Sequence, residues 1–144
     1  MSEYDSDVLK WSEHQATLLR HIAAGERLPA NDIPDWANII DEVESVGRSE
    51  LRSVESLVTQ AMMHRLKQQA WPQSVTVVHW RREARTFSRQ AARRFTASMR
   101  QKLDLAGLYA DAVDQLPDWI DDRVLPLPVP TGCPFSLDEL LDHS

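Results

Sequence analysis

Apolar residues recur along this chain every three to four positions, which is the spacing of an amphipathic helix. Runs of Val, Ile and Thr with a period of two are missing, and the chain contains only four glycines. The pattern therefore predicts an all-α fold. We expect an up-down bundle of three main helices and a broken fourth, followed by a proline-rich C-terminal tail.

The first helix is expected over residues 6–24, because Gly25 is a natural helix terminator. Its apolar positions fall on one face, which comprises Val8, Trp11, Leu18, Leu19 and Ile22. A connector containing Pro29 and Pro34 follows this helix.

The second helix is expected over residues 35–69. At about 100° per residue its apolar side chains stay in phase across Gly47, which favours one continuous, buried face over two separate helices. The stripe comprises Trp36, Ile39, Val43, Val46, Val54, Leu57 and Ala61. The alternatives are a kink at Gly47, or a break with Ser49 capping a new helix.

Trp71-Pro72 ends this helix, because a residue before proline avoids the helical conformation. The third helix is expected over residues 74–102. Its apolar face comprises Trp80, Ala84, Phe87, Ala91 and Phe95. A fourth helix over residues 105–116 is interrupted by Pro117, and a continuation through Trp119, Ile120 and Val124 is one option.

The C-terminal tail, residues 125–144, begins with four prolines between Leu125 and Pro134 and cannot be helical there. We expect this stretch to lie extended on the bundle, held by Leu127 and Val129. Ser136 and Glu139 have the spacing of a capping box, which predicts a last helical turn ending near Asp142.

The composition fits one domain, residues 1–144, since 42% hydrophobic content in 144 residues can form a core. A single cysteine excludes a disulfide scaffold and a cysteine-based zinc site, and it fits a reducing compartment. No apolar run reaches the roughly 18 residues of a membrane span, and the first ten residues do not resemble a signal peptide. We expect a protein of the bacterial cytoplasm without a membrane partner.

Charge is distributed unevenly along the chain. Net charges are −7 for residues 1–60, +9 for residues 61–102 and −8 for residues 103–144. This layout excludes a uniformly acidic nucleic-acid mimic and a uniformly basic coat protein. On the third helix, the arginines opposite the apolar face form one stripe, which comprises Arg82, Arg85, Arg89, Arg93 and Arg100.

The arginine stripe has two interpretations. The acidic segments can neutralise it within one molecule or across a homo-oligomer, which is the favoured interpretation. Alternatively it binds phosphates of a nucleic acid or another anionic partner. No aromatic residue is interleaved in the stripe, so stacking on a single strand is not indicated.

Polar residues on the apolar faces are the candidates for buried chemistry. If the second and third helices form an antiparallel hairpin about Trp71-Pro72, two residues that face each other have numbers that add up to about 144. Glu50 then faces Arg93 or Arg94, and Arg94 lies on the apolar side of its helix. This predicts a buried ion pair between Glu50 and Arg94 that sets the register, since a buried carboxylate needs a partner. His64 faces His79 or Trp80 in the same register.

A metal site is the third possibility. His64 and His79, with Glu83 one turn further, could supply three ligands for Zn²⁺ or Fe²⁺. No HExxH motif supports such a site, and a structural histidine is the simpler interpretation of His64. We therefore expect no cofactor and assign no catalytic residue. Glycine-rich phosphate loops and the GxSxG motif are also missing.

Several strings together resemble a known bacterial family, the domain of unknown function 29. The most specific is Glu42-Val-Glu44-Ser45-Val-Gly47-Arg48-Ser49-Glu50. The others are Tyr4-Asp5-x-Asp7 with Trp11, Asp35-Trp36, Met63-His64-x-Leu66-Lys67, and Cys133-Pro134-Phe-Ser136-Leu-x-Glu139-x-Leu141. The chain departs from the family pattern on the third helix, where the family has an apolar residue one turn after a Trp and this chain has Ala84 after Trp80.

The resemblance implies a helical fold and an important role for Glu50 and His64. It implies no enzymatic activity, because none is established for the family. We therefore expect a non-enzymatic interaction or regulatory module that self-associates through charge complementarity. The alternatives are binding of a nucleic acid or anionic partner by the arginine stripe, and a metal-dependent enzyme around His64 and His79.

Overall fold

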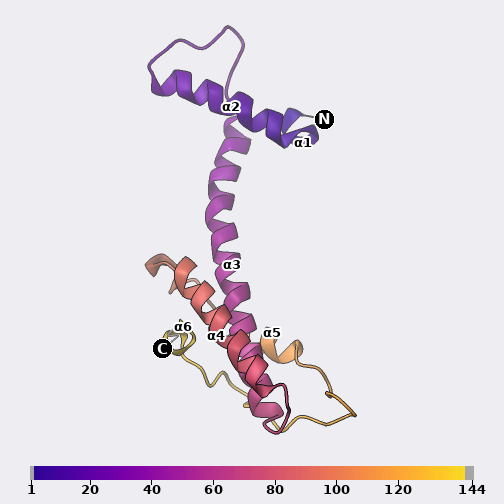
Figure 1. Ribbon diagram of the computed structural model, residues 1–144. Helices are drawn as coiled ribbons and strands as arrows, with labels where there is room; N and C mark the ends of the chain where they lie inside the picture. The colour runs from indigo at the N-terminus through magenta and orange to yellow at the C-terminus, as the bar shows by residue number, and fades with distance from the viewer. Residues whose placement is uncertain (1, 142–144) are drawn as a thin grey trace. The chain divides into compact units, whose positions relative to one another are not determined.

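The computed structural model describes residues 2–141 (Figure 1). Within that range the regular elements are α-helices, one 3-10 turn and a single antiparallel bridge between Ile120 and Val124, so the all-α prediction is confirmed. Contacts divide the chain into two compact units, residues 1–48 (unit 1) and 49–144 (unit 2), where we expected one domain. The reason lies in the apolar stripe of the longest helix, described below.

Unit 1 begins with two helices, α1 (Glu3–Ser6) and α2 (Val8–Ala23), in place of one helix starting at Ser6. The break occurs at Asp7, whose carboxylate accepts a hydrogen bond from the backbone N–H of Lys10 at 3.1 Å and caps α2. Gly25 has φ of 72° and ends the helix as predicted, because this left-handed conformation favours glycine.

Helix α3 (Trp36–Ala70) is continuous across Gly47, as predicted from the phase of its apolar residues. The prediction that this stripe is buried along its whole length is wrong. Val54 and Ala61 are completely buried, whereas Trp36 is 47% and Val43 69% exposed. The stripe is therefore completely buried only in unit 2, beginning at about Leu51, and this difference separates the two units.

Unit 2 is built around the second half of α3. Helix α4 (Val77–Arg94) runs antiparallel to it, α5 (Leu105–Asp114) lies on another side, and α6 (Leu137–Leu141) packs against α4 (Figure 1). Residues from all four helices and the loop after α4 form one apolar core. It contains Val54, Val58, Ala61, Met62, Met63, Leu66, Ala91, Met99, Leu108, Tyr109, Ala112 and Leu140.

Helix α4 ends at Arg94, eight residues before the predicted end at Lys102. Phe95 is extended, with φ −66° and ψ 135°, and a 3-10 turn, η1 (Ala97–Met99), follows. The change of direction lets Met99 enter the core, where it is only 8% exposed. Burial of this side chain outweighs the propensity of the sequence to continue as a helix.

The fourth helix does not continue beyond Pro117. Instead, Asp121 and Arg123 adopt left-handed conformations, and the chain reverses through the bridge between Ile120 and Val124. The extended tail is attached to the end of α3 by a backbone hydrogen bond from Leu127 N–H to the carbonyl of Ala70 at 2.8 Å.

The capping prediction for α6 is confirmed. The Ser136 hydroxyl accepts a hydrogen bond from the backbone N–H of Glu139 at 3.1 Å. Leu140, one residue further along this short helix, is completely buried in the core. The predicted helix end near Asp142 lies outside the described residues.

Candidate functional site

The arginines of α4 form its exposed face. Trp80, Ala84, Ser88 and Ala91 are buried, so the opposite side of the helix must point away from the core. That side carries Arg82, Arg85, Arg89 and Arg93, all exposed, which we call the arginine stripe from here on. It extends about 16 Å along the helix axis at 1.5 Å per residue.

Arg100 does not belong to this stripe, contrary to the prediction, because α4 ends before it. Its guanidinium pairs with Asp138 at 2.9 Å and lies 5.5 Å from the centre of the Phe95 ring. Among the ion pairs of residues 2–141 it is the one that involves a predicted stripe residue. Neutralisation within the chain, the favoured expectation, therefore extends to Arg100 and not to the other four.

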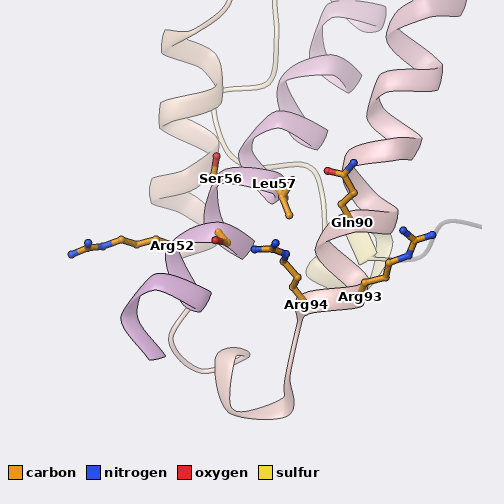
Figure 2. A pocket seen from close by; sticks show the side chains of 7 residues that line it. Arg52, Ser56, Leu57, Gln90, Arg93 and Arg94 are labelled. Carbon is orange, nitrogen blue, oxygen red and sulfur yellow. The ribbon is translucent and has the colours of Figure 1, made fainter. Parts of the chain in front are cut away.

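A basic groove lies where the C-terminal end of α4 meets α3 (Figure 2). Its volume is about 600 Å³, and its lining contains no carboxylate. The groove is lined by Arg52, Ser53, Ser56, Leu57, Gln90, Arg93 and Arg94. In Figure 2 the Arg94 side chain points into the groove toward Leu57, whereas those of Arg52 and Arg93 point outward.

The predicted buried pair between Glu50 and Arg94 is wrong, since both side chains are exposed. Glu50 lies on the apolar side of α3 but precedes Leu51, where burial of that side begins. Nothing in unit 2 covers its carboxylate, so this group needs no charged partner.

The hairpin register differs from the predicted one for a simple reason. Helix α3 ends at residue 70 and α4 begins at residue 77, so facing residue numbers sum to about 147 or more rather than 144. The ring contacts agree with this register, with His64 5.3 Å from Phe87 and Trp71 6.2 Å from Trp80. The predicted register was wrong because helical periodicity does not encode the length of the turn between the two helices.

His64 lies half-buried at the edge of the α3 face, as predicted. Its Nδ1 donates a hydrogen bond to the Gln60 carbonyl at 2.8 Å, and its ring packs against Phe87. Burial lowers the pKa of His64, with the charge of Lys67 acting in the same direction. This is the environment of a neutral structural histidine.

The predicted metal ligands do not assemble into a site. Within residues 2–141 no three or more His, Cys, Asp or Glu side chains lie in an arrangement that could hold a metal ion. His79 is exposed, and the Nδ1 of His64 is already engaged by its own helix. His64, His79 and Glu83 therefore do not form the three-ligand metal site that the sequence suggested as a possibility.

An acidic groove lies on the other side of α3, against α5, and was not predicted. Its volume is about 480 Å³. It is lined by Arg52, Glu55, Ser56, Thr59, Gln60, Leu108, Asp111, Asp114 and Gln115. The sequence feature that could have predicted this groove is the spacing of Asp111 and Asp114, which lie three residues apart on one face of a short helix.

Across the described residues, 2–141, no helix is both long and apolar enough to span a membrane. The family model described as domain of unknown function DUF29 matches residues 3–144. A crystal structure of an alpha-helical protein of unknown function from Rhodospirillum rubrum is similar, with a TM-score of 0.70 and 27% identity. The alignment covers 99% of this chain and 90% of that chain. No curated protein matches.

Proposed function

The chain belongs to the DUF29 family, and on that premise we propose that it is an interaction module whose arginine stripe recognises an acidic protein surface. The observation that carries this proposal is the exposure of Arg82, Arg85, Arg89 and Arg93 without an ion-pair partner within residues 2–141. Four like charges along one helix face repel one another, and an acidic partner relieves that repulsion.

The charge balance of unit 2 favours a protein partner over nucleic acid. Residues 49–144 carry twelve Lys or Arg and twelve Asp or Glu, so the unit is neutral overall although one face is basic. Residues 1–48 carry four basic and ten acidic residues, a net charge of −6. The net negative charge of the whole chain disfavours a polyanionic nucleic acid, whereas a protein partner can present both signs of charge.

The aromatic residues of α4 support the same choice. Trp80 is 7% exposed and Phe87 is half-buried against His64, so the arginine stripe offers no aromatic surface on which bases could stack. We place this activity in the bacterial cytoplasm, since the single cysteine, Cys133, requires no oxidising compartment.

Binding of a fluorescent polyglutamate peptide, measured by anisotropy, tests this function. We expect binding at low salt that weakens as salt screens the exposed charges. The variant Arg85→Glu/Arg89→Glu should weaken binding at least about tenfold, because it reverses the centre of the stripe. The control Arg20→Glu/Arg27→Glu changes net charge equally on α2 and the loop after it, and it should bind like the wild type.

A DNA duplex of equal charge is the competing ligand in this assay. Retention of DNA with no binding of polyglutamate would overturn the proposal in favour of nucleic-acid recognition. Equal binding by wild type and the Arg85→Glu/Arg89→Glu variant would overturn the role of the stripe. Either result is read directly from the same titration.

A further inference from the structure

Two grooves of opposite charge flank the same stretch of α3. The basic groove lies between α3 and α4, and the acidic groove lies between α3 and α5. Both are lined by Arg52 and Ser56, which are exposed and four residues apart, hence on one face of the helix. These two residues form a crest that separates the grooves.

From this arrangement we propose that the acidic partner is a second copy of this chain, with the basic groove of each copy receiving the acidic groove of the other. The proposal rests on the proposed function, because the basic groove includes the last arginine of the stripe, Arg93. It names a partner for the C-terminal end of the stripe, at Arg93, and the surface by which that partner binds.

The positions of the lining residues place the two grooves at the same height along α3. Ser53 and Leu57 lie on the α4 side of the crest, whereas Glu55 and Thr59 lie on the α5 side. The α3 residues that line the basic groove span positions 52–57, and those that line the acidic groove span positions 52–60. The two grooves therefore overlap along the helix and differ in the side of the crest on which they open.

This layout selects one symmetry. A two-fold axis parallel to α3, passing over the crest, turns each copy so that its α4 side faces the α5 side of the other. A two-fold axis perpendicular to α3 would instead place α4 against α4 and bring arginines together. The parallel axis forms both complementary contacts at once, and the assembly closes as a dimer.

The charges that meet in this dimer are opposite in sign and free to pair. The basic groove alone supplies the guanidinium groups of Arg93 and Arg94, and Arg52 on the crest lines both grooves. The acidic groove supplies three carboxylates, from Glu55, Asp111 and Asp114. None of these six side chains takes part in an ion pair within residues 2–141. Arginine and carboxylate suit one another because the planar fork of the guanidinium can donate two parallel hydrogen bonds.

The acidic groove also has a defined shape. The amide of Gln60 donates a hydrogen bond to Gln115 at 2.9 Å, which joins α3 to α5 across the groove. Leu108, which lines the same groove, is 8% exposed and belongs to the apolar core. Both contacts hold the acidic side chains of α5 at a set distance from α3, so the partner meets a preorganised surface.

Sedimentation velocity on the full chain tests the dimer. We expect wild-type protein to form a dimer at low salt that dissociates as salt rises. Arg93→Glu/Arg94→Glu should raise the dissociation constant at least about tenfold, and Asp111→Lys/Asp114→Lys should do the same. The control Arg20→Glu/Arg27→Glu should dimerise like the wild type.

An equimolar mixture of the two groove variants is the decisive sample. In the mixed dimer the reversed basic groove meets the reversed acidic groove, and the two unchanged grooves meet each other, so both contacts are restored. We expect this mixture to dimerise with an affinity within about tenfold of the wild type. A misfolded variant could not restore association, so rescue also verifies that both variants are folded.

Three outcomes would overturn the inference. A wild-type chain that stays monomeric at every salt concentration, yet binds polyglutamate, would leave the proposed function standing and remove the second copy as its partner. Species that keep growing with concentration would replace the two-fold dimer with a head-to-tail chain. Failure of the mixed variants to associate, with both folded by circular dichroism, would exclude the paired grooves.

Discussion

Residues 1–48 and residues 49–144 are stabilised by different kinds of contact. In unit 1 the buried side chains of α2 are Trp11, Gln15 and Leu18. Two of them reach Asp35, since Trp11 Nε1 donates to its carboxylate at 2.9 Å and Gln15 Oε1 accepts from its backbone N–H at 2.7 Å. The hydroxyl of Tyr4 donates to Glu42, which raises the pKa of Tyr4 to about 12.

Unit 2 depends instead on apolar packing. Val54, Val58, Ala61, Met62 and Leu66 are completely buried along one face of α3, and Leu140 reaches them from the far end of the sequence. A hydroxyl even enters this core without a partner, because Ser88 is 1% exposed and its Oγ makes no hydrogen bond among the described residues.

The comparison shows that one amphipathic helix can serve both kinds of unit. The apolar stripe of α3 has the same phase in both halves, yet it is completely buried only where α4, α5 and the tail are available. Where they are not, carboxylates and their donors hold the segments together. Mutations of matched type in the two units should therefore differ in size or in sign.

The largest difference is expected for leucine truncation. Leu66→Ala should lower the free energy of unfolding by about 2–5 kcal/mol, because the side chain is completely buried and a cavity remains. Leu9→Ala, on α2, should change it by less than about 0.5 kcal/mol, since Leu9 is 68% exposed. Denaturant unfolding measures both, and equal losses would contradict the contrast.

The next difference concerns the two tryptophan donors. Trp11 donates to the Asp35 carboxylate, whereas the similarly buried Trp71 donates to the carbonyl of Val124 at 2.8 Å. Trp11→Phe should lower the free energy of unfolding more than Trp71→Phe, which should cost about 0.5–1.5 kcal/mol, because a charged acceptor binds more strongly. Hydrogen exchange of the α2 and α4 amides separates the two effects.

NMR titration of Asp35 provides a second readout for Trp11→Phe. Hydrogen bonds from Asn38 and Trp11 lower the pKa of Asp35 below its ordinary value. Removing the indole donor should move that pKa upward while the bond from Asn38 remains. An unchanged pKa would show that the tryptophan does not act through this carboxylate.

A smaller difference in stability, in which the variant of unit 2 gains stability, is expected when serine is replaced by alanine. Ser88→Ala should stabilise the protein by up to about 1 kcal/mol, because it removes a buried hydroxyl without a partner and improves helix propensity. Ser45→Ala removes a hydroxyl that donates to the Glu42 carbonyl at 2.9 Å, so the loss of this bond should cancel the propensity gain. Paired denaturation curves reveal the difference, and a destabilised Ser88→Ala would contradict it.

The smallest effect is a pH response of opposite direction in the two units. Hydrogen bonding to Asp32, and to Glu3 as well, raises the pKa of His14 above 6.5, whereas burial lowers the pKa of His64 below it. The stabilisation from His14 is therefore complete below about pH 6.5 and is lost as pH rises through its folded pKa. His64 instead destabilises unit 2 as pH falls from about 6.5 through its own lower pKa.

Ring-proton NMR titrations check both directions. The midpoint of His14 should lie above 6.5 and that of His64 below it. His14→Gln serves as the control, because it should abolish the response of unit 1 and leave His64 unchanged. Two midpoints on the same side of 6.5 would remove this distinction between the units.

Local features were predictable because they depend on neighbours in sequence. The phase of Trp36, Val43 and Val54 was enough to predict one continuous α3 across Gly47, and the spacing of Ser136 and Glu139 predicted the cap of α6. The arginine stripe followed in the same way, because residues three and four apart share a helix face. Arg100 was misplaced only because α4 ends before it.

Features that join distant segments were not predictable. The turn over residues 71–76, in which Ser74 N–H bonds to the Trp71 carbonyl at 3.1 Å, shifts the hairpin register and separates Glu50 from Arg94. The basic groove depends on that register, whereas the acidic groove depends on how α5 packs against α3. Turn geometry and long-range packing decide these positions, and a single helix period carries no information about either.

The sequence by itself determined that the chain is helical, which faces of the main helices are apolar, and that four arginines share the outer side of α4. Only the tertiary structure decided which half of the apolar stripe is covered, and that a basic and an acidic groove lie on either side of Arg52 and Ser56. The physical reason is that helical periodicity is a local property of the backbone, whereas burial and charge pairing depend on segments brought together by folding.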